Sequence, residues 1–530
     1  MPQRVQLAVL PERKKDQDFL IHLISKSLNV ASNKIGHIKL IRENIDARRK
    51  PIKYKLTFEV YAKSEKVAFQ KAKFNFLDVH HAKPVFIIGA GPAGLFAALK
   101  ALEIGLKPIV IERGKKVKDR RRDLAQLVKN HEVNPNSNYC FGEGGAGTYS
   151  DGKLYTRSKK RGNQQEILEK LVWFGASEDI LVKAHPHIGT NKLPKIIEAI
   201  REKIIEKGGE IWVEHLLTDI EIEKNTVKSI SVKNLQNSAV EKIATNSLML
   251  ATGHSARDIF YLLHQKKIAL EQKPFALGVR VEHPQALINR IQYHCSLEQL
   301  EETIEFLPPA AYSWVEQIEG NGVYSFCMCP GGVIAPCATA QEEVVTNGWS
   351  PSKRNNPWAN SGIVTEITHD HTRNYAEFEA LAGLKFQEEV EHKMWVAGGK
   401  SQMAPAQRLL DFVNGKTSKD LPSCSYLAGI TPAPLHELLP EFVYKRLRKA
   451  FLKVGKKMKG YLTNEAVVVA TESRTSSPVR IPRDKISFEH IDVKGLFPVG
   501  EGAGYAGGIV SAAMDGSNCM EKINLKLQSV

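Results

Sequence analysis

A glycine-rich turn near residue 90 has the spacing needed to hold a diphosphate. Residues 84–98 read PVFIIGAGPAGLFAA, which places Gly-x-Gly-x-x-Gly between a β-branched run and a helical stretch. Gly89 permits the tight turn, Gly91 lets the backbone approach a pyrophosphate, and Gly94 lets the helix pack on the sheet. The helix start would present free N–H groups and a positive dipole end to the phosphates. The expected ligand contacts of this turn are Gly89, Ala90, Gly91, Pro92, Ala93 and Gly94.

An acidic residue lies where the sugar of such a ligand is expected. Glu112 comes 18 positions after Gly94, directly after the apolar run 108–111. A carboxylate near this offset accepts from ribose hydroxyls, and it repels a 2′-phosphate, so the site should not prefer NADP. The alternative is that the glycines form an ordinary turn of an α/β protein and that Glu112 is a surface residue. Because strand, helix and acid are all in place, we expect Glu112 and the adjacent Arg113 to contact a dinucleotide.

Three further stretches combine glycine with small residues. Residues 140–153 hold five glycines in one loop, residues 248–254 form an apolar strand ending in Ala-Thr-Gly-His, and residues 496–509 run from a strand through glycines into the last helix. Backbone amides next to glycine can approach a ligand closely, and a helix N-terminus favours negative charge. A flexible surface loop is the alternative for the first stretch. The expected cofactor contacts are Gly144, Gly145, Thr148, Ala251, Thr252, Gly253, Gly500, Glu501, Gly508 and Ile509.

These stretches together resemble the FAD-binding domain of the glutathione-reductase-like flavoprotein superfamily. Four segments are also similar to segments of a bacterial family of uncharacterised FAD-dependent dehydrogenases, often labelled NAD(FAD)-utilising. These segments are residues 144–153, 273–284, 471–481 and 500–509. The similarity spans nearly the whole chain and includes residues 45–51. The resemblance implies FAD and a redox role, with no established substrate.

Candidate reactive groups lie outside the glycine motifs. Arg474 and Arg480 could bind an anionic substrate bidentately, although arginines also form ordinary surface salt bridges. Lys153 could stabilise a reduced flavin anion, or it could be a solvated lysine. Cys327 and Cys329 would share one face of a strand, either as a redox-active pair or as buried structural thiols. The cysteine and histidine spacings do not form a zinc site.

The pattern of apolar residues predicts an α/β protein in four segments. Residues 1–83 form a small basic α+β domain, and residues 84–270 form the first part of a Rossmann-like FAD-binding domain. Residues 271–459, rich in proline, aromatics and short strands, form a mixed α+β substrate or cap domain. Residues 460–530 return to the FAD-binding domain, with strands at 465–470 and 496–499 and a closing helix at 508–525.

The amino-acid composition indicates a globular protein. The chain has 530 residues, 42% apolar and 25% charged, which is typical of a globular protein and excludes wholesale disorder. Seven scattered cysteines, an odd number, favour a reducing compartment. We find neither a secretory signal pattern nor the roughly 18 uninterrupted apolar residues of a membrane span. These features predict a cytoplasmic location.

The net charge of +16 is concentrated near the N-terminus. Residues 1–83 hold 18 Lys+Arg against 8 Asp+Glu. The preferred hypothesis is a FAD-dependent oxidoreductase that transfers hydride between an unknown small substrate and flavin. The alternatives are a flavoprotein that binds or modifies RNA through this basic domain, and an interaction scaffold with structural FAD. Since no second Gly-x-Gly-x-x-Gly follows a strand, NAD(P)H is expected only as a transient donor; the oligomeric state is not predicted.

Overall fold

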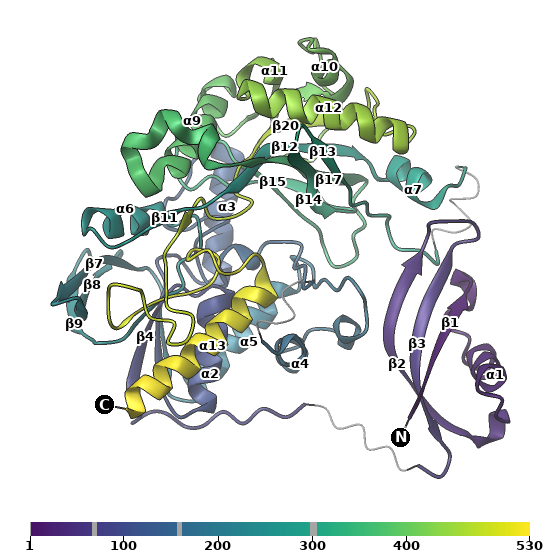
Figure 1. Cartoon of the computed structure of the whole chain (residues 1–530), viewed down its shortest axis with the longest axis horizontal. Helices are drawn as coiled ribbons and strands as arrows, with labels where there is room; N and C mark the ends of the chain where they lie inside the picture. The colour runs from purple at the N-terminus through teal and green to yellow at the C-terminus, as the bar shows by residue number, and fades with distance from the viewer. Residues whose placement is uncertain (1, 66–71, 156–161, 297–304, 530) are drawn as a thin grey trace.

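A five-stranded parallel sheet carries the glycine turn (Figure 1). The computed structural model describes residues 2–65, 72–155, 162–296 and 305–529. The strand order is β22-β10-β4-β5-β6, and every neighbouring pair is parallel. The bounds are β4 Pro84–Ile88, β5 Lys107–Ile111, β6 Glu210–Trp212, β10 Leu248–Leu250 and β22 Leu496–Pro498. The predicted α/β class with a Rossmann-like sheet is confirmed.

Helices pack on this sheet because apolar residues run along their faces. Helix α2 (Pro92–Glu103) is almost entirely buried, and α13 (Ile509–Gln528) packs against it. The contact is close enough that a Cβ at Gly516 would lie 2.0 Å from the Ala93 carbonyl oxygen, so only glycine fits there. The other helices of this half are α3 (Val117–Asn130), α4 (Gln164–Trp173), α5 (Leu193–Glu206) and α6 (Arg257–Gln265). A separate antiparallel sheet is formed by β7 (His215–Glu223), β8 (Thr226–Asn234) and β9 (Val240–Ala244).

A seven-stranded sheet forms the second layer, and helices cover its outer face (Figure 1). Its order is β13-β14-β17-β12-β20-β18-β19. The strands are β12 (Phe275–Pro284), β13 (Val315–Ile318), β14 (Asn321–Cys329), β17 (Trp358–Ile367), β18 (Ala404–Arg408), β19 (Ile430–Pro432) and β20 (Val467–Glu472). The covering helices are α9 (Ala382–Ala397), α10 (Leu409–Asn414), α11 (Leu435–Leu438) and α12 (Glu441–Lys457). The remaining elements are α7 (Gln285–Tyr293), β11 (Glu271–Gln272), β15 (Val333–Pro336), β16 (Thr346–Trp349) and β21 (Val479–Arg480).

The position of β20 corrects the boundary predicted between residues 459 and 460. This strand pairs with β12 and β18 of the seven-stranded sheet, so the chain rejoins the parallel sheet only at Leu496. All six residues of β20 are buried. A short apolar run of this kind suits the centre of either sheet, and periodicity alone does not show which sheet it enters.

The N-terminal unit is a small α+β layer beside the main body (Figure 1). Its sheet has the order β1-β3-β2, formed by β1 (Gln3–Val9), β2 (Ile35–Asp46) and β3 (Lys53–Ala62). Helix α1 (Gln17–Leu28) begins at Asp16, whose carboxylate accepts from the Phe19 amide. Glu43 exchanges backbone hydrogen bonds with residues 182 and 184, and the Tyr54 hydroxyl donates to the Phe306 carbonyl. The unit is therefore fixed to both layers. No helix among the described residues combines the length and apolar character that a membrane crossing requires.

Candidate functional site

The glycine turn lies where the strand order of the parallel sheet reverses. Strands β5 and β6 lie on one side of β4, and the later strands β10 and β22 lie on its other side. The carboxyl ends of β4 and β10 therefore flank a topological switch point, the usual place for a ligand in such sheets. Gly89 has φ of +103°, and a Cβ there would lie 2.5 Å from the Ala251 carbonyl oxygen. Glycine is thus required at the first position of the turn.

Glu112 faces the turn, as the ribose hypothesis requires. Its Oε2 accepts from the Ala90 amide at 2.8 Å, and its Oε1 accepts from the amides of Gly114 and Gly142 at 2.9 and 3.0 Å. The residue is only 5% exposed. An ionised carboxylate offers about four lone-pair sites, so one remains for a sugar hydroxyl. Glu112 also has a role that the sequence did not show, since it links the turn to the loop around residue 142.

The neighbouring Arg113 is held by protein groups. Its guanidinium donates to Asn136 and to Asp258, the latter at 2.9 Å, and lies 4.4 Å from the centre of the Phe141 ring. These contacts orient Arg113 along the 136–141 segment. Its predicted contact with a cofactor stays a prediction.

The loop after Cys140 packs directly on the turn. The Gly144 amide donates to the Ala90 carbonyl at 2.8 Å, and a Cβ on Gly145 would lie 3.0 Å from the Gly91 Cα. Thr148 is fully buried, and its hydroxyl donates to the Glu143 carbonyl. The side chain of Thr148 therefore braces the loop, and its predicted contact with a cofactor stays a prediction.

Two more segments complete the same edge of the sheet. The Ala251 amide donates to the Ile88 carbonyl, and Gly502 approaches residue 253 so closely that a Cβ would lie 2.5 Å from its carbonyl oxygen. The Gly500 amide donates to Asp515 Oδ2 at 2.8 Å. The structure thus brings residues 89–94, 112, 144–148, 251–253 and 500–509 together at one place.

The open sides of four glycines show where a ligand would fit. A Cβ added to Gly253, Gly507 or Gly508 would meet no described atom within 4 Å, and at Gly91 the nearest atom is 4.0 Å away. Helices α2 and α13 both begin after a glycine, and within the described part of the chain neither has a side-chain cap. Uncapped N–H groups beside open glycines suit an anionic, extended ligand such as FAD.

His254 and Glu501 lie beside these glycines and were not singled out as a pair. Glu501 Oε2 is 3.3 Å from His254 Nδ1, and His254 Nε2 lies 3.2 Å from the Arg474 carbonyl oxygen. Burial opposes ionisation of Glu501, but the contacts with His254 and the Gly508 amide lower its pKa. The pair places an ionised carboxylate next to the start of α13. Only proximity in the folded chain reveals it, because 247 positions separate the two residues.

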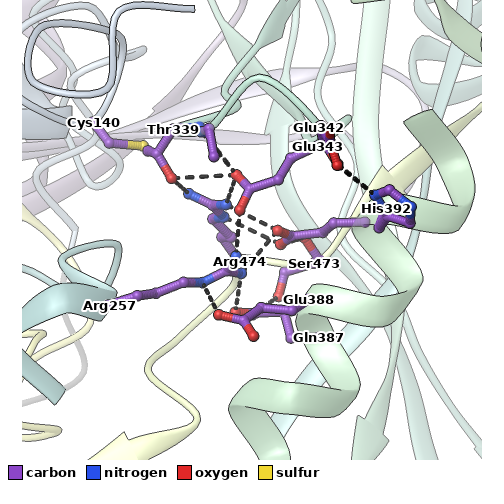
Figure 2. Close-up of polar contacts among 12 residues, drawn as sticks. Cys140, Arg257, Thr339, Glu342, Glu343, Gln387, Glu388, His392, Ser473 and Arg474 are labelled. Carbon is purple, nitrogen blue, oxygen red and sulfur yellow. Dashed lines mark hydrogen bonds and ion pairs between the residues drawn. The ribbon is translucent and has the colours of Figure 1, made fainter. Parts of the chain in front are cut away.

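Arg474 belongs to a buried ion-pair network in the cap (Figure 2). Its guanidinium donates to Thr339 Oγ1 at 2.7 Å, Glu343 Oε2 at 2.6 Å and Glu391 Oε2 at 2.9 Å. Arg257 donates to the same two glutamates. The third guanidinium nitrogen, Nε, donates to Glu391 Oε1 at 3.1 Å, so all three have protein partners. The prediction that Arg474 binds an anionic substrate is replaced by a structural role, because its charge is already neutralised.

The other three candidate reactive residues lie together. Lys153 Nζ is 3.3 Å from Cys327 Sγ and 3.6 Å from Cys329 Sγ. Lys153 directly follows the glycine loop of residues 142–152, whereas the cysteines end β14 of the seven-stranded sheet. Within the described residues, no three or more His, Cys, Asp or Glu side chains gather where they could hold a metal ion.

Comparison with known proteins assigns the family. A protein of Clostridium beijerinckii, described as an uncharacterized protein, is 37% identical over 528 residues, and the match covers 96% of each chain. The chain belongs to the same family as this clostridial protein. Residues 274–475 match the family described as "FAD-dependent protein, C-terminal domain-like". Residues 1–61 match a domain family of unknown function.

Solved structures with similar folds are more distant. A flavoprotein/dehydrogenase from Cytophaga hutchinsonii is 10% identical, with 84% of this chain and 79% of that chain covered and a TM-score of 0.35. A geranylgeranyl bacteriochlorophyll reductase-like protein from Thermoplasma acidophilum is 12% identical, with 84% and 80% covered and a TM-score of 0.35. Identities and TM-scores this low say nothing about activity.

The basic N-terminal unit has its own ion pairs. Asp46 binds Arg48 at 2.7 Å and Lys55 at 2.9 Å. These contacts neither require nor exclude a nucleic acid. The RNA-binding alternative stays a prediction.

Proposed function

We propose that the protein is a FAD-dependent oxidoreductase that transfers hydride between a small organic substrate and the flavin. One observation carries the proposal: five glycine-rich or acidic segments, far apart in the sequence, meet at the switch point of a parallel sheet and leave glycine faces open. The family match of residues 274–475 to FAD-dependent proteins supports it.

Each segment has a physical role in this proposal. The amides at the start of α2 would bind the diphosphate, and Glu112 would accept a hydrogen bond from the ribose of the adenosine half. The N–H groups at the start of α13, after Gly508, would stabilise the negative charge that the flavin gains on reduction. The flavin itself supplies the hydride chemistry, and the protein supplies binding, orientation and electrostatic tuning.

The substrate would lie between the parallel sheet and the cap. Lys153 is a charged side chain that joins the two layers, since its ammonium contacts the end of β14 while its backbone follows the glycine loop. Asp151 lies 3.9 Å from the ammonium and binds Arg354 at 2.9 Å. This cluster would orient a polar substrate at the mouth of the site.

The proposal predicts that some donor bleaches the bound flavin. Protein saturated with FAD should lose its visible flavin absorbance under anaerobic conditions with at least one of NADH, NADPH or a panel of small organic metabolites, and air or another acceptor should restore it. Free FAD with the same donors is the control. A flavin that stays oxidised with every donor would contradict the oxidoreductase function and favour a structural role for FAD.

A further inference from the structure

Two thiols of the cap and a lysine of the opposite layer form a compact cluster. Lys153 lies 3.3 Å from Cys327 Sγ and 3.6 Å from Cys329 Sγ. The Cys329 thiol lies 3.3 Å from the Cys327 carbonyl oxygen. Cys327 is partly exposed, Cys329 is buried, and the Lys153 side chain is 36% exposed. An incoming molecule would therefore reach Cys327 before Cys329.

A β-bulge sets the position of the two thiols. Phe326 pairs with Gly362 and Cys329 with Asn360, so β14 has one residue more than β17 at this point. Cys327 has φ of +48°, a left-handed conformation that is uncommon outside glycine. Bulges re-aim side chains and occur preferentially beside active sites. Both sulfurs lie within 3.6 Å of the same Lys153 ammonium, so the two side chains point to one place, as a disulfide between them requires.

The charges around the pair make its two members unequal. The hydrogen bond from Cys329, followed by the positive charges of Lys153 and Arg280, lowers the pKa of Cys327 despite burial and the nearby Asp151. Donation to Cys327 and burial raise the pKa of Cys329. The ionised groups that face the pair are Lys153, Arg280, Asp151 and Glu472. These contacts favour the thiolate form of Cys327 and the thiol form of Cys329, the combination that thiol–disulfide exchange requires.

We propose that Cys327 and Cys329 are a redox-active thiol pair that reduces a small-molecule disulfide. The Cys327 thiolate attacks one sulfur of the substrate, the substrate S–S bond breaks, and one thiolate leaves from the resulting mixed disulfide. Cys329 then passes its proton to the thiolate released first and attacks Cys327 Sγ, which releases the second thiolate and closes the Cys327–Cys329 disulfide. The substrate gains two electrons and the pair loses two. This proposal depends on the thiol geometry and stands whether or not the protein binds FAD.

Stoichiometry in the full-length protein tests the proposal. Fully reduced protein, freed of reductant, is mixed with dithiobis(nitrobenzoate), an aromatic disulfide whose thiolate is coloured. We expect a fast phase that releases about two thiolates per chain, a protein mass lower by two hydrogens with no aryl group attached, and a Cys327–Cys329 link in the digested product. The Cys329→Ser variant should release one thiolate and keep one aryl group, and Cys327→Ser should lose the fast phase. Cys295→Ser, which changes another partly exposed cysteine, is the matched control and should behave like the parent.

The role of Lys153 is tested by rate and pH dependence. Lys153→Met should slow the fast phase about tenfold at neutral pH. The pH at which the rate of this phase increases should move toward the ordinary thiol pKa of about 8.5. Lys153→Arg should restore most of the rate. Two aryl adducts on separate cysteines, or a fast phase that survives in Cys327→Ser, would overturn the proposal. The digest of the unsubstituted protein shows whether Cys327 and Cys329 are linked or separately modified, even if a variant does not fold.

Discussion

Glu391→Gln is expected to lower the free energy of unfolding by about 3–5 kcal/mol, because it leaves buried cations without their carboxylate. Glu391 is fully buried in helix α9 and contacts both Arg257 and Arg474. Urea unfolding at neutral pH measures the loss. Glu441→Gln, which removes an exposed ion pair with Lys445, is the control and should leave the unfolding midpoint unchanged. An equally small effect of Glu391→Gln would contradict a structural role for the network.

The same network has a pH signature. Burial alone would raise the pKa of Glu391, but Arg257 and Arg474 lower it to about 2. A carboxyl with a lowered pKa in the folded state stabilises the fold above its unfolded pKa and loses that contribution as the pH falls through the folded value. The difference in stability between the parent and Glu391→Gln should therefore be full above about pH 5 and shrink steadily toward pH 2. A difference that stays constant over this window would show that the carboxylate charge is not what stabilises the network.

Gly91→Ala is expected to weaken FAD binding by about a hundredfold, equivalent to about 2.8 kcal/mol, while the unliganded protein keeps its stability. Gly91 has φ of −77° and ψ of −175°, which any residue adopts, and its added Cβ would have no described protein atom closer than 4.0 Å. The methyl group would instead occupy the place where a diphosphate approaches the backbone. Fluorescence titration measures the affinity, and thermal unfolding without FAD measures the stability.

A second glycine provides the control for this variant. Gly322 in β14 also lacks a left-handed φ, and a Cβ there would lie 3.8 Å from its nearest neighbour, in ordinary contact. Gly322→Ala should therefore leave FAD affinity unchanged. If Gly91→Ala bound FAD as tightly as Gly322→Ala, the diphosphate would not lie against the glycine turn.

Local patterns in the sequence predicted the elements that place the turn. The β-branched run before Gly89, the helix after it and the apolar run before Glu112 appear as β4, α2 and β5. Such elements follow from nearest neighbours along the chain, so a single sequence shows them. The last helix, α13, was recognised in the same way.

Contacts between residues far apart in the sequence could not be predicted from local patterns. Arg474 meets Glu391 from 83 positions away and Glu343 from 131 positions away, so the neighbours of Arg474 in the sequence do not show that its charge is neutralised. The run 467–472 has the composition of any buried strand, and only pairing with β12 and β18 shows that it belongs to the cap. The contact of Lys153 with Cys327 likewise spans 174 positions.

Titration of the cofactor-free protein with FAD tests the central claim most directly. The account predicts saturation at one FAD per chain, with a visible flavin spectrum that stays with the protein through gel filtration. A protein that remains colourless after incubation with excess FAD, with no change in flavin fluorescence at any concentration, would contradict it.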